Sequence, residues 1–282
     1  MLDNIDITKI LFFDIETVPG AKDFSELDEN WQYLWQRKAD YLLKISKDDK
    51  EKLENNPDKK AKELALKQYK EDAAKKYNEA GIYAEFGKII CISVGFIYKD
   101  KDTEAYKVRT KSFANEDEKK LLQEFSHLMN TTYNRFDDID IVELVDDKGN
   151  KKKLQLLKNY FCGHNIKEFD VPYICRRLLI NGLKLPRMFD LAGKKSWEVP
   201  HLLDTMELWK FGDYKSSTSL NLLAATFGFP SPKEDMDGSQ VARVYYEEKD
   251  LPRIAKYCEK DVIAVMRLLM KYKLMPDELE IS

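Results

Sequence analysis

Ile10-Leu11-Phe12-Phe13-Asp14-Ile15-Glu16 is the stretch of sequence from which the fold is predicted. Its apolar run predicts a buried strand, and Val18-Pro19-Gly20 predicts where that strand ends. Alternate residues of a strand point to the same face, so Asp14 and Glu16 project together while Ile15 faces the opposite way. The stretch therefore places two carboxylates beside a core, although this spacing alone also fits a strand that leaves the core for solvent.

The composition indicates an ordinary globular protein. The chain has 282 residues, of which 43% are hydrophobic, so it can bury a full core in one or two domains. Its cysteines contain no Cys-x-x-Cys pair, which argues against a disulfide framework and structural zinc. They are Cys91, Cys162, Cys175 and Cys258. We expect reduced thiols in a cytosol.

Neither export nor membrane insertion is expected. The first residues lack a basic segment followed by an apolar run, and no later stretch approaches the length of a bilayer span. The formal net charge of −3 does not favour a polyanion ligand. Carboxylates that hold cations would change the local potential, however, so nucleic acid stays open as a partner of a soluble, cytoplasmic protein.

Residues 22–80 predict a helical insertion after the first strand. They carry 14 Lys and Arg and 14 Asp and Glu, with helical spacing in two pieces joined near Pro57. Strands predicted at residues 88–98 and 104–113 would complete a β-meander with the first strand. A solvated helical hairpin is favoured over a nucleic-acid clamp because the charges cancel, and a protein partner is a further possibility. Residues 137–157 predict a surface hairpin or loop.

Two further motifs carry acids. Asp170 follows a short strand and a turn that begins with Gly163-His164-Asn165, at a position where a helix N-cap is an alternative role. His164 favours a turn or packing role, because no second histidine has the spacing of a metal ligand. Tyr257 and Asp261 lie four residues apart on one helix face, where a buried aspartate is unfavourable unless it is paired or bound to a metal.

The conjunction of these motifs predicts a metal site. Asp14, Glu16, Asp170 and Asp261 come from three separate elements and can converge only if cations compensate their mutual repulsion. Carboxylates suit Mg²⁺ or Mn²⁺, and two such ions roughly 4 Å apart can promote phosphodiester hydrolysis.

These residues resemble the DEDD exonucleases of the ribonuclease-H-like superfamily, in their tyrosine variant. The three matching stretches are Phe13-Asp14-Ile15-Glu16-Thr17, Gly163-His164-Asn165 through Phe169-Asp170, and Tyr257-x-x-x-Asp261. More narrowly, the chain resembles predicted exonucleases related to the proofreading domain of family-B DNA polymerases. That resemblance rests on Ser219-Leu220-Asn221-Leu222-Leu223-Ala224, Asp237-Gly238-Ser239-Gln240-Val241 and Tyr257-Cys258-Glu259-Lys260-Asp261-Val262.

The resemblance implies a fold and residue roles. The fold would be a ribonuclease-H-like α/β domain over residues 1–282, with a mixed central sheet flanked by helices and the insertion 22–80. Asp14 would bridge two ions, Glu16 and Asp261 would complete one site, and Asp170 would serve the other. Tyr257 would orient the attacking water. Three more residues are assigned more loosely: Asn165 and Phe169 would shape the site, and Asp204 is either a neighbour of the site or a helix cap.

The expected activity is removal of nucleotides from the 3′ end of single-stranded nucleic acid, with DNA favoured. Lys194-Lys195-Ser196-Trp197 or Lys210-Phe211 are predicted to guide the strand, because they place cations beside aromatic rings. Two alternatives stay open. The first is a 3′–5′ exoribonuclease, since nothing in these motifs recognises the sugar 2′-hydroxyl. The second is a catalytically silent nucleic-acid-binding or scaffold domain.

Overall fold

The computed structural model describes residues 2–55, 57–133, 139–145, 151–157, 159–213, 215, 217–231, 235–276 and 279–281. The chain forms two compact units. The sheet unit comprises residues 1–16, 89–241 and 250–282, and the helical unit comprises residues 17–88 and 242–249. The prediction of one domain over the whole chain stays a prediction.

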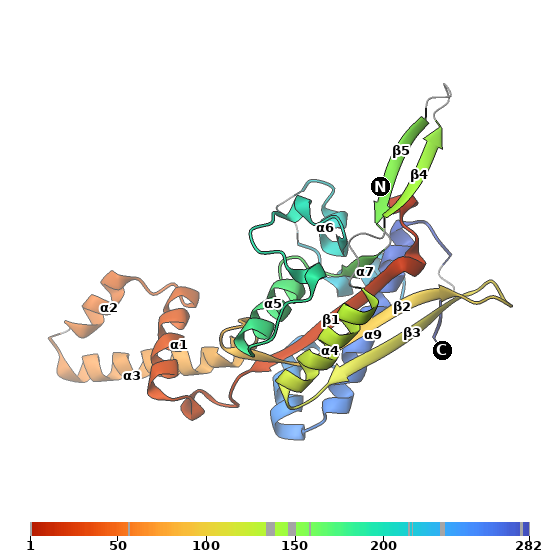
Figure 1. The fold of residues 1–282 in the computed structure, drawn as a ribbon. Coiled ribbons are helices and arrows are strands. Elements are labelled where there is room, and N and C mark those ends of the chain that lie inside the picture. The colour runs from red at the N-terminus through yellow and green to blue at the C-terminus, as the bar shows by residue number, and fades with distance from the viewer. Residues whose placement is uncertain are drawn as a thin grey trace. The chain divides into compact units, whose positions relative to one another are not determined.

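A six-stranded mixed sheet organises the sheet unit (Figure 1). Its strands, in spatial order, are β7 (Leu202–Asp204), β6 (Tyr160–Gly163), β1 (Ile10–Pro19), β2 (Gly87–Lys99), β3 (Tyr106–Ala114) and β8 (Leu279–Ile281). The β2–β3 pair is antiparallel, whereas β1–β6, β6–β7 and β3–β8 are parallel. The strands β1, β2 and β3, which come first in the sequence, are neighbours, and β6 and β7 extend the sheet beyond β1. This order confirms the predicted ribonuclease-H-like α/β fold.

Helices join these strands and complete the chain. In the sheet unit they are α4 (Glu118–Thr132), α5 (Asp170–Ile180), α6 (Thr205–Lys210), α7 (Leu220–Phe227) and α9 (Leu251–Tyr272), whereas most of α8 (Val241–Arg243) belongs to the helical unit. Short 3₁₀ turns occupy Leu2–Asn4, Ile7–Lys9, Arg187–Phe189, Ser196–Glu198 and Gly238–Gln240. Among the described residues, no helix is long and apolar enough to cross a bilayer.

Alternation along β1 builds two different cores. Ile10 and Phe12 pack with Val265 and Leu269 of α9 on one face of the sheet. Phe13 points to the other face, where its ring lies 5.8 Å from that of Phe189. Figure 1 shows α9 on one side of β1 to β3 and α4 on the other. Because Asp14 and Glu16 have the same parity as Phe12, they point to the face that α9 covers.

Gly95 of β2 allows α9 to approach the sheet closely. A Cβ atom at this position would lie 2.6 Å from the Met266 Cε and 3.2 Å from the Val262 Cγ1. Both distances are shorter than ordinary van der Waals contacts, so a larger residue would force the helix or its side chains to move.

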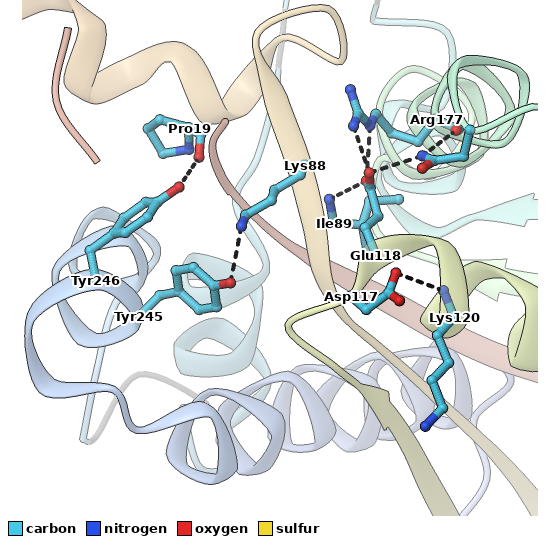
Figure 2. Close-up of polar contacts among 10 residues, drawn as sticks. Pro19, Lys88, Ile89, Asp117, Glu118, Lys120, Arg177, Tyr245 and Tyr246 are labelled. Carbon is cyan, nitrogen blue, oxygen red and sulfur yellow. Dashed lines mark hydrogen bonds and ion pairs between the residues drawn. The ribbon is translucent and has the colours of Figure 1, made fainter. Parts of the chain in front are cut away.

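A buried ion pair joins α4, α5 and the beginning of β2 (Figure 2). Arg177 donates from Nε to Glu118 Oε1 at 2.8 Å and from Nη2 to Oε2 at 2.5 Å. The Ile89 amide donates to Oε1 at 2.7 Å, and Asn181 Nδ2 donates to Oε2 at 2.9 Å. The side chains of Arg177 and Glu118 are 12% and 8% exposed, so this carboxylate is satisfied by donors instead of by solvent.

The helical unit contains the predicted insertion. Its helices are α1 (Glu29–Leu42), α2 (Lys47–Glu54) and α3 (Lys59–Lys76), with 3₁₀ turns at Phe24–Glu26 and Tyr77–Ile82 and a π-helix at Val244–Glu248. Trp35 centres a small core with Ala39, Ala73 and Tyr77, and its indole donates to the Ala73 carbonyl at 2.8 Å. Tyr246 donates to the Pro19 carbonyl and Lys88 donates to Tyr245 within this unit (Figure 2).

The insertion was predicted to contain two helices, and this number was wrong because it contains three. A third helix, α2, begins after Leu42 because Ser46 and Asp49 form a capping box: the Ser46 hydroxyl accepts from the Asp49 amide while Asp49 accepts from the Ser46 amide. The predicted hairpin at residues 137–157 is confirmed by the antiparallel strands β4 (Ile139–Val145) and β5 (Lys151–Leu157). Residues 137–138 and 146–150 of this stretch lie outside the described residues.

Candidate active site

The fold brings the acids predicted from three motifs to one place in the sheet unit. Asp14 and Asp261 line the same cavity of about 490 Å³, together with Asn165 and Glu168. Asp170 and Glu16 are buried and lie close enough to Asp14 for their charges to act on it. The middle of β1, the start of α5 and the middle of α9 therefore converge.

Burial and mutual repulsion make this cluster unfavourable without a counter-charge. Burial raises the pKa of Asp14 well above its ordinary value, and the charges of Asp170, Asp261 and Glu16 raise it further. Burial likewise raises the pKa of Asp170 to about 8, with additional repulsion from Asp204 and Asp261. A site that holds carboxylates in this state is prepared to accept cations.

Asp170 does not cap α5, which corrects the alternative role considered for it. Phe169 is the N-cap residue and makes no side-chain capping bond, while Asp170 is the first helical residue. Its Oδ1 instead accepts from the Ile15 amide of β1 at 3.2 Å. This bond between residues distant in sequence fixes the Asp170 carboxylate beside the two acids of β1.

Tyr257 lies next to the acids and is largely buried. Burial raises the pKa of its hydroxyl, as do the charges of Asp261, Glu16 and Asp14 and a hydrogen bond with Asp261. The hydroxyl therefore keeps its proton and can act as a hydrogen-bond donor at the edge of the cluster. This placement agrees with the predicted position, and the catalytic role of Tyr257 stays a prediction.

Hydrogen bonds of His164 and Asp204 hold the turn after β6. His164 has the structural role that was expected, because Nδ1 lies 2.9 Å from Thr205 Oγ1 and Nε2 lies 2.9 Å from the Thr218 carbonyl. Asp204 caps α6 through the Met206 amide at 2.9 Å and also accepts from the Asn165 amide at 2.9 Å. Asp204 is therefore both a helix cap and a neighbour of the site.

Two features of this turn bear on the shape of the cavity. A Cβ atom on Gly163 would lie 2.8 Å from the Phe13 carbonyl oxygen, so only glycine lets β6 pass the end of the apolar part of β1 so closely. Asn165 adopts a left-handed conformation with φ of 68°, and its Oδ1 is buried without a hydrogen-bond partner among the described residues. A buried acceptor of this kind needs a donor, which a bound water or ligand can supply.

Cys258 is a site residue that the sequence analysis did not identify. Its thiol donates to the Asp14 carbonyl at 3.4 Å and to Asp14 Oδ2 at 3.5 Å. One ligand atom each of Asp14, Glu16 and Cys258 lies within 4.8 Å of the other two. Burial raises the pKa of the Cys258 thiol well above its ordinary value, so without a metal the thiol keeps its proton and donates a hydrogen bond to Asp14. Its position directly after Tyr257, facing β1, was the available signal.

The predicted substrate-binding residues lie in different places. Asn165 lines the cavity that contains the acids. The Phe169 ring packs 5.4 Å from that of Tyr173, at the beginning of α5. Lys194 and Lys195 line a separate cavity, described below, and are not among the described lining residues of the acid-containing one.

The chain belongs to the family of predicted 3′–5′ exonucleases related to the exonuclease domain of PolB. The model of that family matches residues 137–282, just over half of the chain. This matched region contains Asp170, Tyr257 and Asp261, whereas Asp14 and Glu16 precede it. Membership in the family supports a nuclease activity.

A similar solved structure is the family B DNA polymerase from the hyperthermophilic archaeon Pyrobaculum calidifontis. The two chains are 14% identical with a TM-score of 0.46, and the match covers 94% of this chain and 24% of the polymerase. The chain thus spans about a quarter of the length of that polymerase. A comparison with curated proteins finds no match.

The raised pKa of Asp170 predicts how the stability of the metal-free protein depends on pH. An acid whose pKa is higher in the folded state than its ordinary value of 3.8 binds its proton more tightly when folded. Its stabilising contribution is therefore present below pH ~4 and is lost as the pH rises toward ~8. We expect the melting temperature in EDTA to fall over this interval and Mg²⁺ to restore it most at the alkaline end.

Thermal denaturation of the wild type and Asp170→Asn, each with EDTA and with Mg²⁺, checks this expectation. The variant should lose much of the slope in EDTA, because the amide does not ionise. A wild-type melting temperature in EDTA that rises toward pH ~8 would contradict it.

Proposed function

We propose that the chain is a metal-dependent 3′–5′ exonuclease that removes nucleotides from the end of single-stranded nucleic acid, with DNA favoured. The observation that carries the proposal is the convergence of Asp14, Glu16, Asp170 and Asp261 from three elements, with Asp14 and Asp261 lining a cavity. The charges of Asp170, Asp261 and Glu16 all act on Asp14, so these acids repel one another. Membership in the exonuclease family supports the same reaction.

The residues present fit hard divalent cations. Oxygen donors from carboxylates suit Mg²⁺ or Mn²⁺, and burial and then mutual repulsion raise the pKa of Asp14 and of Asp170, a cost that such cations would relieve. Asp14 would contact both ions, with Glu16 and Asp261 completing one position and Asp170 the other. When bound, two ions would activate the attacking water and stabilise the leaving oxygen.

The chain's own residues supply orientation. Cys258 would hold the Asp14 carboxylate in place through its thiol. The Asp170 carboxylate is fixed by the Ile15 amide, so it approaches the cluster from the side of α5. The Tyr257 hydroxyl would donate to or accept from the attacking water and so align it with the scissile phosphorus. Tyr257 and the four acids are the residues to which the resemblance to the tyrosine variant of the DEDD exonucleases gives these roles.

A nuclease assay tests the proposal and its alternatives together. Single-stranded DNA and RNA, each labelled at the 5′ end, are incubated with Mg²⁺, Mn²⁺ or EDTA. A metal-dependent ladder that shortens from the 3′ end is expected, faster on DNA. Faster cleavage of RNA would favour the exoribonuclease alternative. Binding without cleavage of either strand would favour a silent binding domain, in which residues 22–80 are proposed to contact a protein partner.

Tyr257→Phe separates a catalytic tyrosine from a core tyrosine. The ring and its packing are kept and all four acids stay in place, so metal and strand binding should persist. Turnover should fall by roughly 10- to 1000-fold, the scale of losing a positioned polar group that acts in the transition state. The measurements are manganese calorimetry and single-turnover cleavage of a short labelled strand.

Each alternative outcome has a defined meaning. Wild-type cleavage by Tyr257→Phe would show that the hydroxyl takes no part in the reaction. Lost manganese binding would show that Tyr257 supports the site structurally through its hydrogen bond with Asp261. Tyr133→Phe serves as a matched control, because Tyr133 packs against Phe161 and takes no part in the acid cluster.

A further inference from the structure

An apolar cavity of about 480 Å³ lies beside α5, apart from the acids. Its wall is formed by one side of α5 and by the irregular segment of residues 185–199. Among the described residues that line it, none is acidic, and the charged ones are all cations: Lys167, Arg176, Lys194 and Lys195. In a chain with a net charge of −3, an apolar interior with a purely cationic lining fits a ligand that has an apolar body and a negative charge.

This cavity adjoins the candidate active site through a third one. A cavity of about 300 Å³ shares Lys167 and Ser196 with it. That cavity also shares Asn165, Glu168 and Met206 with the cavity that contains Asp14 and Asp261. The shared lining residues show that the three cavities are adjacent.

The cationic side chains that line the cavity differ in their contacts within the protein. Lys167 forms an ion pair with Glu207 at 2.5 Å, which neutralises part of its charge. The Lys195 ammonium lies 5.0 Å from the centre of the Trp197 ring, and that ring is 73% exposed. Arg176, Lys194 and Lys195 are themselves exposed, so their charges are accessible to a ligand. Exposed cations beside an aromatic ring and an apolar cavity match the chemistry of a base attached to a phosphate.

We propose that the cavity beside α5 is a second nucleotide-binding site. A base contacts the accessible apolar side chains of Pro172, Leu179 and Leu185, and its phosphate meets Arg176, Lys194 and Lys195. The proposal rests on the proposed nuclease function for its ligand class. The ligand is either an internal nucleotide of the bound strand or a released nucleoside monophosphate, since both carry the same base and phosphate.

Binding in EDTA tests the site separately from hydrolysis. The ligands are a deoxynucleoside monophosphate, a short single-stranded oligodeoxynucleotide and inorganic phosphate, each titrated by calorimetry against the wild type. The double variant Lys194→Ala/Lys195→Ala removes the phosphate contacts, and Ala192→Phe fills the cavity. Lys184→Ala is the matched control, because Lys184 is exposed in the same region and does not line the cavity.

We expect the double variant and Ala192→Phe to weaken binding by at least about tenfold, while the control leaves it unchanged. The double variant should also flatten the salt dependence. If these variants weaken binding of the monophosphate, the ligand is a free nucleotide. If they weaken binding of the oligonucleotide alone, the ligand is an internal nucleotide of the strand. Either result supports the site.

Three results would overturn the proposal. They are unchanged binding in the double variant, equal weakening by the Lys184→Ala control, and inorganic phosphate binding as tightly as the monophosphate. The lysines are exposed, so the double variant tests the site even if Ala192→Phe does not fold. Binding is measured in EDTA, where no hydrolysis is expected. If the wild type binds nucleotide in EDTA but cleaves no strand with Mg²⁺ or Mn²⁺, the proposed function is contradicted and this binding site is still supported.

Discussion

Asp14→Ala should abolish hydrolysis while the protein stays folded. Asp14 is the acid on which the charges of Asp170, Asp261 and Glu16 all act, so its removal takes away the centre of the cluster. We expect cleavage of a labelled single strand to fall on the order of 10⁴-fold or more, as when one member of an interdependent catalytic group is deleted. The assay is single-turnover cleavage with saturating Mn²⁺.

The same variant should melt at a higher temperature than the wild type in EDTA. Burial and repulsion make the ionised Asp14 unfavourable in the folded state, and alanine removes that penalty. Added Mg²⁺ should then stabilise the wild type but not the variant. Asp102→Ala is the control, since Asp102 is exposed in the turn between β2 and β3. Unfolding of Asp14→Ala, or cleavage at the wild-type rate, would contradict the catalytic assignment of Asp14.

Arg177→Leu should destabilise the sheet unit more than any other single change discussed so far. The guanidinium provides two of the donors to the buried Glu118 carboxylate, and leucine leaves that charge without compensation. Removing one partner of a buried ion pair costs about 3–5 kcal/mol in the free energy of unfolding. Urea denaturation monitored by circular dichroism measures this change.

Glu118→Gln and the double variant complete the comparison. Glutamine keeps an acceptor for the Ile89 amide and removes the charge. The double variant Arg177→Leu/Glu118→Gln should therefore be more stable than Arg177→Leu alone. Arg176→Leu is the matched control on the same helix, because Arg176 is exposed. Destabilisation by Arg177→Leu of less than about 1 kcal/mol, as for a surface pair, would contradict the structural role assigned to this bond.

Local periodicity was sufficient to place the residues of the first and third motifs. A strand repeats every two residues, so Asp14 and Glu16 had to share a face, and Ile10 and Phe12 indicated that this face was packed. A helix repeats every 3.6 residues, which put Tyr257 and Asp261 on one side of α9. Local patterns also predicted the β-meander of the first three strands, and the sheet confirms that β1, β2 and β3 are neighbours.

Periodicity failed where a contact joins residues far apart in sequence. Asp170 has the local surroundings of a helix cap, yet its carboxylate accepts from Ile15, 155 residues away. Asp204 does cap a helix, and the same side chain also holds the turn at Asn165. The third insertion helix was missed for a different reason, since its capping box was present in the sequence and only its polar composition hid it.

The sequence by itself determined which acids the chain offers, on which elements they lie and which face of β1 or α9 carries them. Only the tertiary structure decided that Cys258 orients Asp14, that Asp170 is held by β1, and that a cationic, apolar cavity adjoins the site. The physical reason is that backbone geometry repeats over a few residues and leaves its period in the sequence. Contacts across the sheet depend instead on which strands become neighbours and how closely α9 packs on them, which no local pattern specifies.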